Sequence, residues 1–120
     1  HTVASVSCDR YRREELLTAL ARAGIGWKPR FRGNGPKDGD ADIRATRKLF
    51  LSGSVKLHPS DLMTLALAET DVRVSYTGAC QLDKASRVSR IDLAQALVLG
   101  CSALMEDRER VPPQYTVEVL

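Results

Sequence analysis

Two aspartates, Asp9 and Asp92, are the residues whose positions could support chemistry. Asp9 directly follows a short run rich in β-branched residues and precedes a helical pattern. A carboxylate at the C-terminal end of a buried strand lies at the sheet edge where open α/β folds bind ligands. Asp92 falls in the first turn of the most apolar helical pattern. If folding brings both carboxylates together, they can share Mg²⁺ or Mn²⁺, hard cations that assist phosphodiester hydrolysis.

Each aspartate also has a purely structural explanation. Aspartate is a favoured N-cap residue, so Asp9 alone fits the cap of the helix that follows it. The run from Ser89 to Asp92 matches the S-x-x-[DE] capping box. From spacing alone, two helix caps are favoured over a shared metal site.

The positions of apolar residues and chain breakers predict helices alternating with strands. Helices are expected up to Ala23–Gly24, from Asp40 or Asp42 to Leu51, after a capping Ser60, and over residues 91–105. Strands are expected at 3–8, 25–31, 55–57 and 72–76, with a polar turn at 77–86 and a tail at 115–120 that could add an edge strand. In the third helix Leu62, Leu65, Ala66 and Ala68 are expected to face a core. The alternation predicts an α/β layer fold.

Composition permits a nucleic-acid partner without requiring one. The 120 residues suit a single small domain with 28% charged residues, 5% aromatic residues and a formal charge of +3. Arg44, Arg47 and Lys48 share one helix face at i, i+3, i+4 spacing. Such a stripe is more often a solvated surface than a DNA contact, but Arg32 and Lys37 lead into it.

The three cysteines and the hydropathy pattern exclude several classes. The cysteines lie far apart, in no C-x-x-C pair and no ligand ladder with the two histidines, which argues against a zinc site. Free thiols favour a reducing cytoplasm. No apolar run approaches the roughly 20 residues that cross a bilayer. The chain opens directly on a strand-like run, and we expect it to be a piece of a longer protein.

A longer pattern resembles a known family. Residues 31–44, F-R-G-N-G-P-K-D-G-D-A-D-I-R, are similar to the F-R-G-x-G-x-K-D-G-x-x-D-[VI]-R stretch of the large terminase subunits of tailed phages. Residues 9–12 resemble the D-R-[YW]-R that precedes it there. Residues 82–84 and 90–96 are similar to that family's K-L-x-K and R-x-D-x-A-x-A segments. Order and spacing agree over residues 5–105.

The resemblance implies the C-terminal nuclease domain of a viral packaging motor, with an RNase H-like (resolvase-like) mixed sheet flanked by helices. Such domains cut concatemeric double-stranded phage DNA with two Mg²⁺ or Mn²⁺ ions in the bacterial host cytoplasm. ATP belongs to an upstream domain, and the portal and the small terminase subunit are partners of the full-length protein. By position, Asp9 and Asp92 would be the metal-binding acids and Lys84 a contact to the scissile phosphate. The cations expected to contact DNA are Arg32, Lys37, Arg44, Arg47 and Lys48.

Departures from the family pattern set further expectations. The family has another essential aspartate on a first strand, upstream of residue 1, and Gln81, Pro36 and Ile91 replace common family residues. We therefore expect residues 1–110 to form a partial nuclease domain that lacks its first strands, followed by a tail at 111–120. We expect weak or no nuclease activity from this chain alone. An exposed sheet edge would also offer a route to self-association.

Two other hypotheses remain open. A resolvase- or transposase-type nuclease would share the converging carboxylates but not the glycine-rich loop. A non-enzymatic α/β module would use Asp9 and Asp92 as helix caps and Arg44, Arg47 and Lys48 to bind nucleic acid or a partner protein.

Overall fold

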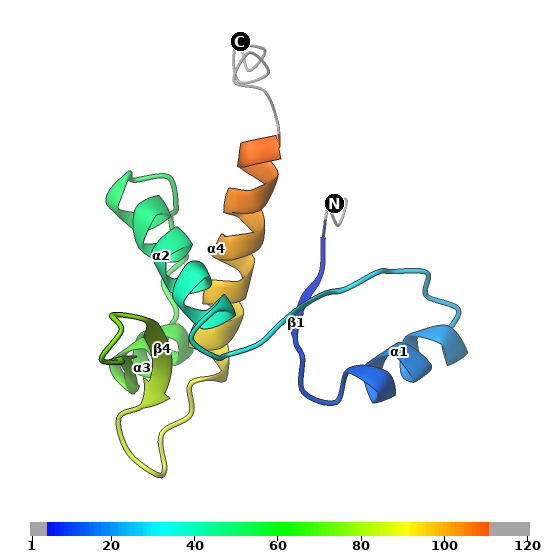
Figure 1. Ribbon diagram of the computed structural model, residues 1–120, viewed down its shortest axis with the longest axis horizontal. Helices are drawn as coiled ribbons and strands as arrows, with labels where there is room; N and C mark the ends of the chain where they lie inside the picture. The colour runs from blue at the N-terminus through cyan, green and yellow to red at the C-terminus, as the bar shows by residue number, and fades with distance from the viewer. Residues whose placement is uncertain (1–4, 111–120) are drawn as a thin grey trace.

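The computed structural model describes residues 5–110, which form four helices and four short strands (Figure 1). In chain order the elements are β1 (Ser7–Asp9), α1 (Arg13–Arg22), β2 (Arg30–Arg32), α2 (Asp38–Leu51), α3 (Asp61–Ala68), β3 (Thr70–Val74), β4 (Cys80–Lys84) and α4 (Asp92–Arg110). The tail expected at 111–120 and the start of the strand expected at 3–8 lie outside the described residues.

The strands form two separate pairs. β1 and β2 are parallel, with Ser7 opposite Arg30 and Asp9 opposite Arg32. β3 and β4 form an antiparallel hairpin, with Thr70 opposite Lys84. The expectation of a mixed α/β fold is therefore confirmed, with small sheets in place of one broad sheet.

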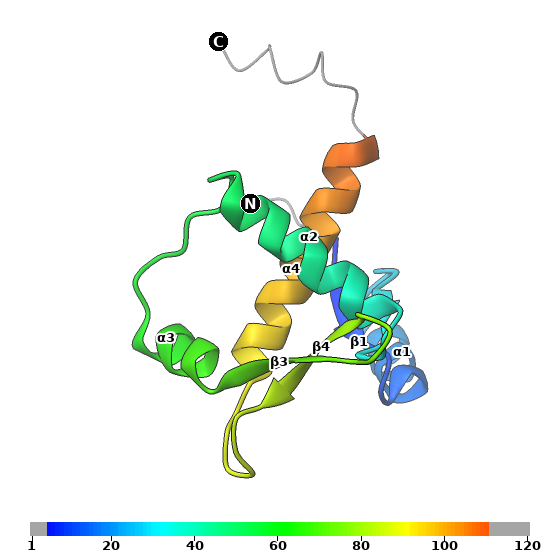
Figure 2. The same ribbon diagram turned by 60° about the vertical axis from the view of Figure 1, so that its left-hand side comes forward.

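Helix α4 is the centre of the molecule. It contacts α2, α3 and β1, and it crosses α2 in Figure 2. Leu49 on α2 is completely buried, and Ala94 and Cys101 on α4 are nearly so. The apolar stripe of this helix was expected to pack against a sheet, but α4 packs mainly against the helices α2 and α3 and makes a smaller contact with β1. Among the described residues no helix, α4 included, is both long and apolar enough to cross a membrane.

Helix α1 stands apart from this core. Figure 1 shows it on the far side of β1 from α2 and α4. None of its residues is buried, although Leu16, Leu17 and Leu20 are half-buried. Helix α1 therefore depends more on interactions among its own residues than on packing against the core.

Several helix ends follow from local chemistry, as expected. The Ser60 side chain caps α3 by accepting a hydrogen bond from the Met63 N–H at 3.2 Å. Helices α1 and α2 end just before Gly24 and Gly53, whose φ angles of 69° and 70° suit glycine. A left-handed residue after the last turn is a common way to end a helix.

Three expectations about strands are wrong. The strand at 25–31 shrinks to Arg30–Arg32, since β1 offers only three residues to pair with. Residues 55–57 form no strand. The polar segment 77–86 contains β4, because a strand in an exposed hairpin needs no apolar alternation once β3 satisfies its backbone.

The expected core face of α3 is also mostly wrong. Ala66 is buried, but Leu62 is 71% and Leu65 55% exposed. Helix α3 is only eight residues long and packs against the start of α4 through one narrow side. The apolar spacing correctly predicted a helix. Within the described residues, however, no other element covers the exposed leucines of its apolar stripe.

Replacing Leu49 tests the α2–α4 core. Because Leu49 has no exposed surface, Leu49→Ala should lower the free energy of unfolding by about 3 kcal/mol. The same change at Leu51, which lies on the same helix but is 77% exposed, should have little effect. Urea denaturation followed by circular dichroism measures both, and equal losses would show that the core lies elsewhere.

Candidate functional site

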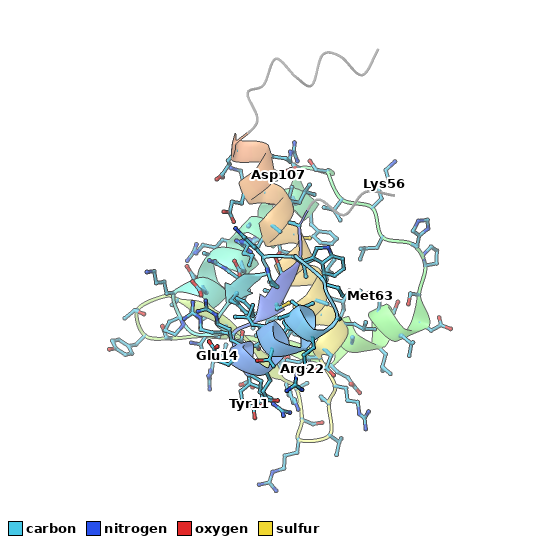
Figure 3. All side chains as sticks on the ribbon, turned by 90° about the vertical axis from the view of Figure 1, so that its right-hand side faces the viewer. Tyr11, Glu14, Arg22, Lys56, Met63 and Asp107 are labelled. Carbon is cyan, nitrogen blue, oxygen red and sulfur yellow. The ribbon has the colours of Figure 1, made fainter. Side chains whose placement is uncertain are left out.

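Asp9 and Asp92 line the same groove. The groove has a volume of about 550 Å³ and runs between β1 and one face of α4. The two elements run in opposite directions (Figure 1), so the end of β1 lies beside the start of α4. Figure 3 shows Tyr11, which closely follows Asp9, at the opposite end of the molecule from Asp107 on α4. The two acids therefore share one end of the groove.

Asp9 is not the N-cap of α1. One carboxylate oxygen accepts the backbone N–H of Tyr11 at 2.7 Å, which makes a tight turn after β1. Helix α1 starts only at Arg13, preceded by Arg12 with a φ of 57° and no side-chain cap. The cap interpretation of Asp9 is therefore wrong. The carboxylate is exposed and held in orientation by its own backbone.

Asp92 is not part of a capping box. The Ser89 hydroxyl accepts the N–H of Ser86 at 3.0 Å, and the N–H of Arg90 donates to a Glu69 carboxylate oxygen at 3.0 Å. Asp92 begins α4, where a negative charge suits the positive end of the helix dipole. Its carboxylate is exposed and has no hydrogen-bond partner in the described part of the chain. Both aspartates are thus available to a ligand.

A buried ion pair joins β2 to α2 beside this site. The Arg32 guanidinium donates to both carboxylate oxygens of Asp42, at 2.7 and 3.2 Å. Asp42 is 2% exposed and also accepts the Ser102 hydroxyl at 2.5 Å. The hydrogen bond from Arg32 to Asp42 raises the pKa of the guanidinium. A buried carboxylate requires such partners because desolvation penalises its charge.

The same chain of bonds reaches along α4. Arg30 donates to the Ser102 hydroxyl at 3.1 Å and forms an ion pair with Glu106 at 2.6 Å. We call Arg30, Arg32, Asp38, Asp42, Ser102 and Glu106 the ion-pair network. It fixes α4, which carries Asp92, against β2, which pairs with the strand that carries Asp9.

Asp38 ties the glycine-rich loop into this network. It accepts the backbone N–H of Gly33 at 2.9 Å and forms ion pairs with Arg10 at 3.1 Å and Arg32 at 3.4 Å. The Gly33 N–H, followed by Arg32 and Arg10, lowers the pKa of Asp38 below its usual range. A Cβ on Gly39, in the first turn of α2, would lie 3.3 Å from the Asn34 carbonyl oxygen, so a larger residue there would require a small shift of the loop.

The cations expected to contact DNA fall in three places. Arg32 is held in the ion-pair network, and Lys37 lines a small groove on the loop with Arg10. The third place is the outer face of α2, which carries Arg44, Arg47 and Lys48.

That face forms a groove of about 520 Å³. Arg44 pairs with Asp40 at 2.8 Å and donates to the Gly78 carbonyl oxygen at 3.4 Å. The Cys80 N–H, then Arg44, lowers the pKa of Asp40. Arg47 and Lys48 are exposed and have no ion-pair partner within residues 5–110. These two are the cations most available to a phosphate.

Lys84 does not join the two aspartates. It is exposed at the end of β4, where its backbone N–H donates to Asp83 at 2.9 Å. It lines neither of the grooves that Asp92 lines. Sequence reasoning also missed Asp42, Ser102 and Glu106. The sequence did contain one signal for these ion pairs: Asp38 and Asp42 lie at i, i+4 spacing shortly after Arg30 and Arg32.

The fold and site define a mixed α/β scaffold with one exposed carboxylate at the end of a parallel strand and another at the start of α4. The structure is similar to the crystal structure of the HK97 bacteriophage large terminase, with a TM-score of 0.75 and 24% sequence identity. The match covers 85% of this chain and 21% of that chain, so this chain spans about a fifth of the terminase's length. No protein-family model and no curated protein matches the chain. The likeness to a phage large terminase expected from the sequence motifs is confirmed at the level of the fold.

Removing the buried charge tests the ion-pair network. Asp42→Asn should lower the free energy of unfolding by about 3 kcal/mol, because Arg32 loses a buried partner. Asp40→Asn breaks an exposed pair on the same helix and should cost far less. Urea denaturation measures both. Equal effects would mean that the Arg32–Asp42 pair is not a main support of the fold.

Acid should weaken the fold through Asp38. Because its pKa in the folded state lies below the usual value near 4, its stabilisation is complete above about pH 5 and is lost as the pH falls through the folded-state pKa. Asp38→Asn should be less stable than the unmodified chain at neutral pH and should lose less stability on acidification. Urea midpoints measured from neutral pH down to about pH 2 check this. Parallel pH profiles would contradict it.

Proposed function

We propose that this chain is a metal-dependent endonuclease module of the terminase large-subunit type. Its RNase H-like fold would cleave concatemeric double-stranded phage DNA. The observation that carries the proposal is that Asp9 and Asp92, distant in sequence, line one groove at the end of a parallel strand. The fold similarity to the HK97 large terminase supports it. In this proposal the full-length protein carries an ATPase domain upstream of this chain and acts with the portal and the small subunit in the bacterial cytoplasm.

The two carboxylates fit a hard divalent cation. The Tyr11 N–H holds one Asp9 oxygen and leaves the other available, and Asp92 is exposed on the first turn of α4. Bound Mg²⁺ or Mn²⁺ would polarise a phosphodiester and lower the pKa of an attacking water. Residues 5–110 contain no cluster of three or more potential ligands among His, Cys, Asp and Glu. The pair therefore suits one ion completed by water, and a two-ion site needs further oxygen ligands.

Other side chains have supporting roles in this proposal. Arg47 and Lys48 would contact the DNA backbone, since they are exposed and lie on one face of α2. Arg32 and Lys37 lie near the loop, where Arg32 acts mainly by holding Asp42. Lys84 would reach the scissile phosphate only if the substrate spans from the groove to the end of β4.

Mn²⁺ titration tests the site directly. In two-dimensional NMR spectra, paramagnetic Mn²⁺ should broaden signals near residues 9 and 92 before others. Asp9→Asn and Asp92→Asn should each weaken Mn²⁺ binding by about tenfold, equivalent to about 1.4 kcal/mol. Asp71→Asn, which removes an exposed acid on β3, is the matched control and should leave the broadening unchanged. If Asp71→Asn reduced the broadening as much as Asp9→Asn or Asp92→Asn, Mn²⁺ would be binding to exposed acids in general and the proposed site would be wrong.

Cleavage assays extend the same test. Because the described residues hold no cluster of three or more potential metal ligands, the purified chain should show little or no Mg²⁺-dependent cutting of plasmid DNA. Efficient cutting would show that the ligand set is already complete and that this part of the proposal is wrong.

The alternatives give different results in the same experiments. A resolvase- or transposase-type nuclease would bind Mn²⁺ at Asp9 and Asp92 but prefer branched or end-specific DNA over linear concatemers. A non-enzymatic module would show no specific Mn²⁺ site. Its retention of DNA or of a partner protein would depend on Arg44, Arg47 and Lys48 and would be indifferent to Asp9→Asn.

A further inference from the structure

Gln95 lines two cavities beside the candidate metal site. The larger is the groove that Asp9 and Asp92 share. The smaller is a cleft of about 30 Å³, roughly the space of a single water molecule, between the glycine-rich loop, α2 and α4. Among the described residues, Asp9, Gln95 and Leu99 line both cavities. Gln95 is therefore the uncharged polar residue that accompanies Asp9 where the two cavities meet.

The geometry of α4 places Gln95 beside Asp92 as well. The Gln95 N–H donates to the Ile91 carbonyl oxygen at 2.9 Å, so the start of α4 is a regular α-helical turn. Residues three apart on such a turn share one face, with their Cβ atoms about 5–6 Å apart. Gln95 thus lies one turn along the helix from Asp92 and lines the same groove as Asp9.

The side chain of Gln95 lacks a polar partner of its own. It is half-buried, and its carboxamide makes no hydrogen bond within residues 5–110. Further along the groove, the lining residues of α4 before Asp107 are all small or apolar: Ala96, Leu99, Gly100, Ala103 and Leu104. Partial burial of an amide without a hydrogen bond is unfavourable. A ligand held jointly with the neighbouring carboxylates would account for this glutamine.

We propose that Gln95 supplies a third oxygen ligand to the divalent cation at Asp9 and Asp92, an inference that rests on the proposed function. Carboxamide oxygens are hard, neutral donors that bind divalent cations alongside carboxylates and water. Such a donor adds a ligand without adding to the repulsion between the two carboxylates. The described residues contain no third acidic ligand in a cluster with these two, and an uncharged oxygen meets part of that need.

Isothermal titration calorimetry with MnCl₂ measures the contribution of Gln95. Gln95→Leu removes the oxygen and should weaken Mn²⁺ binding about fivefold, less than the loss of an aspartate, because it removes a dipole rather than a charge. Gln95→Glu places a charged oxygen donor at the same position and should tighten binding about tenfold. Leucine and glutamate are both good helix formers, so both variants should keep the circular dichroism spectrum of the unmodified chain.

Gln81 provides matched controls. It lies on β4, where its side-chain oxygen accepts a hydrogen bond from Arg73 at 2.9 Å, and it lines neither cavity. Gln81→Leu should leave the dissociation constant for Mn²⁺ unchanged. Gln81→Glu adds the same charge as Gln95→Glu at a distance from the site, where salt screens it, and should change the dissociation constant by less than about twofold.

The outcomes distinguish this inference from the proposed function. Weaker binding in Gln95→Leu together with tighter binding in Gln95→Glu supports a direct ligand, since a glutamine that only supported the fold would not bind more tightly as a carboxylate. If Mn²⁺ binding depends on Asp9 and Asp92 but the Gln95 variants behave like the Gln81 variants, only this inference is overturned. If binding depends on neither aspartate, the metal site is wrong and the inference fails with it.

Discussion

The buried pair between Arg32 and Asp42 is the interaction on which the rest of the arrangement depends. An ionised carboxylate with 2% exposure is tolerable only because a bidentate guanidinium and the Ser102 hydroxyl surround it. Each partner comes from a different element, so satisfying one charge positions three elements at once. Apolar packing holds α2 against α4, but it is less directional. The hydrogen bond from the Ser102 hydroxyl to Asp42 ties α4 to this pair.

These ion pairs give the glycine-rich motif that resembles the terminase sequence a structural role. Two of its cations, Arg32 and Lys37, were expected to contact DNA. In the structure, the charged residues mostly satisfy one another: Arg32 binds Asp42 and Asp38, and Asp38 in turn accepts the Gly33 N–H. Gly39 allows the Asn34 carbonyl to approach α2 closely. The motif is best understood as a structural clamp that holds the end of β1, with Arg47 and Lys48 outside it as the cations left to contact a partner.

The structural features that could be predicted from the sequence are those whose cause lies in neighbouring residues. Ser60 as an N-cap, and the glycines after α1 and α2, act through neighbouring residues and were predicted correctly. The strand β4 and the exposed positions of Leu62 and Leu65 depend on which element lies opposite, which no local pattern records. Asp9 and Asp92 line one groove, but the caps proposed for them were wrong, because Asp9 bonds to Tyr11 and Ser89 to Ser86. The ion-pair network joins residues up to 72 positions apart and required the fold itself.

Asp9 and Asp92 line a groove whose other wall carries small and apolar residues of α4. A ligand lying in this groove would exclude water from its apolar side. Low dielectric strengthens the attraction of two carboxylates for a cation, but it also strengthens their mutual repulsion when no cation is bound. Occupation of the groove should therefore make the site more dependent on a divalent ion. Because the ion-pair network holds α4 in position from the opposite side, the two aspartates can face that ligand without the fold having to rearrange.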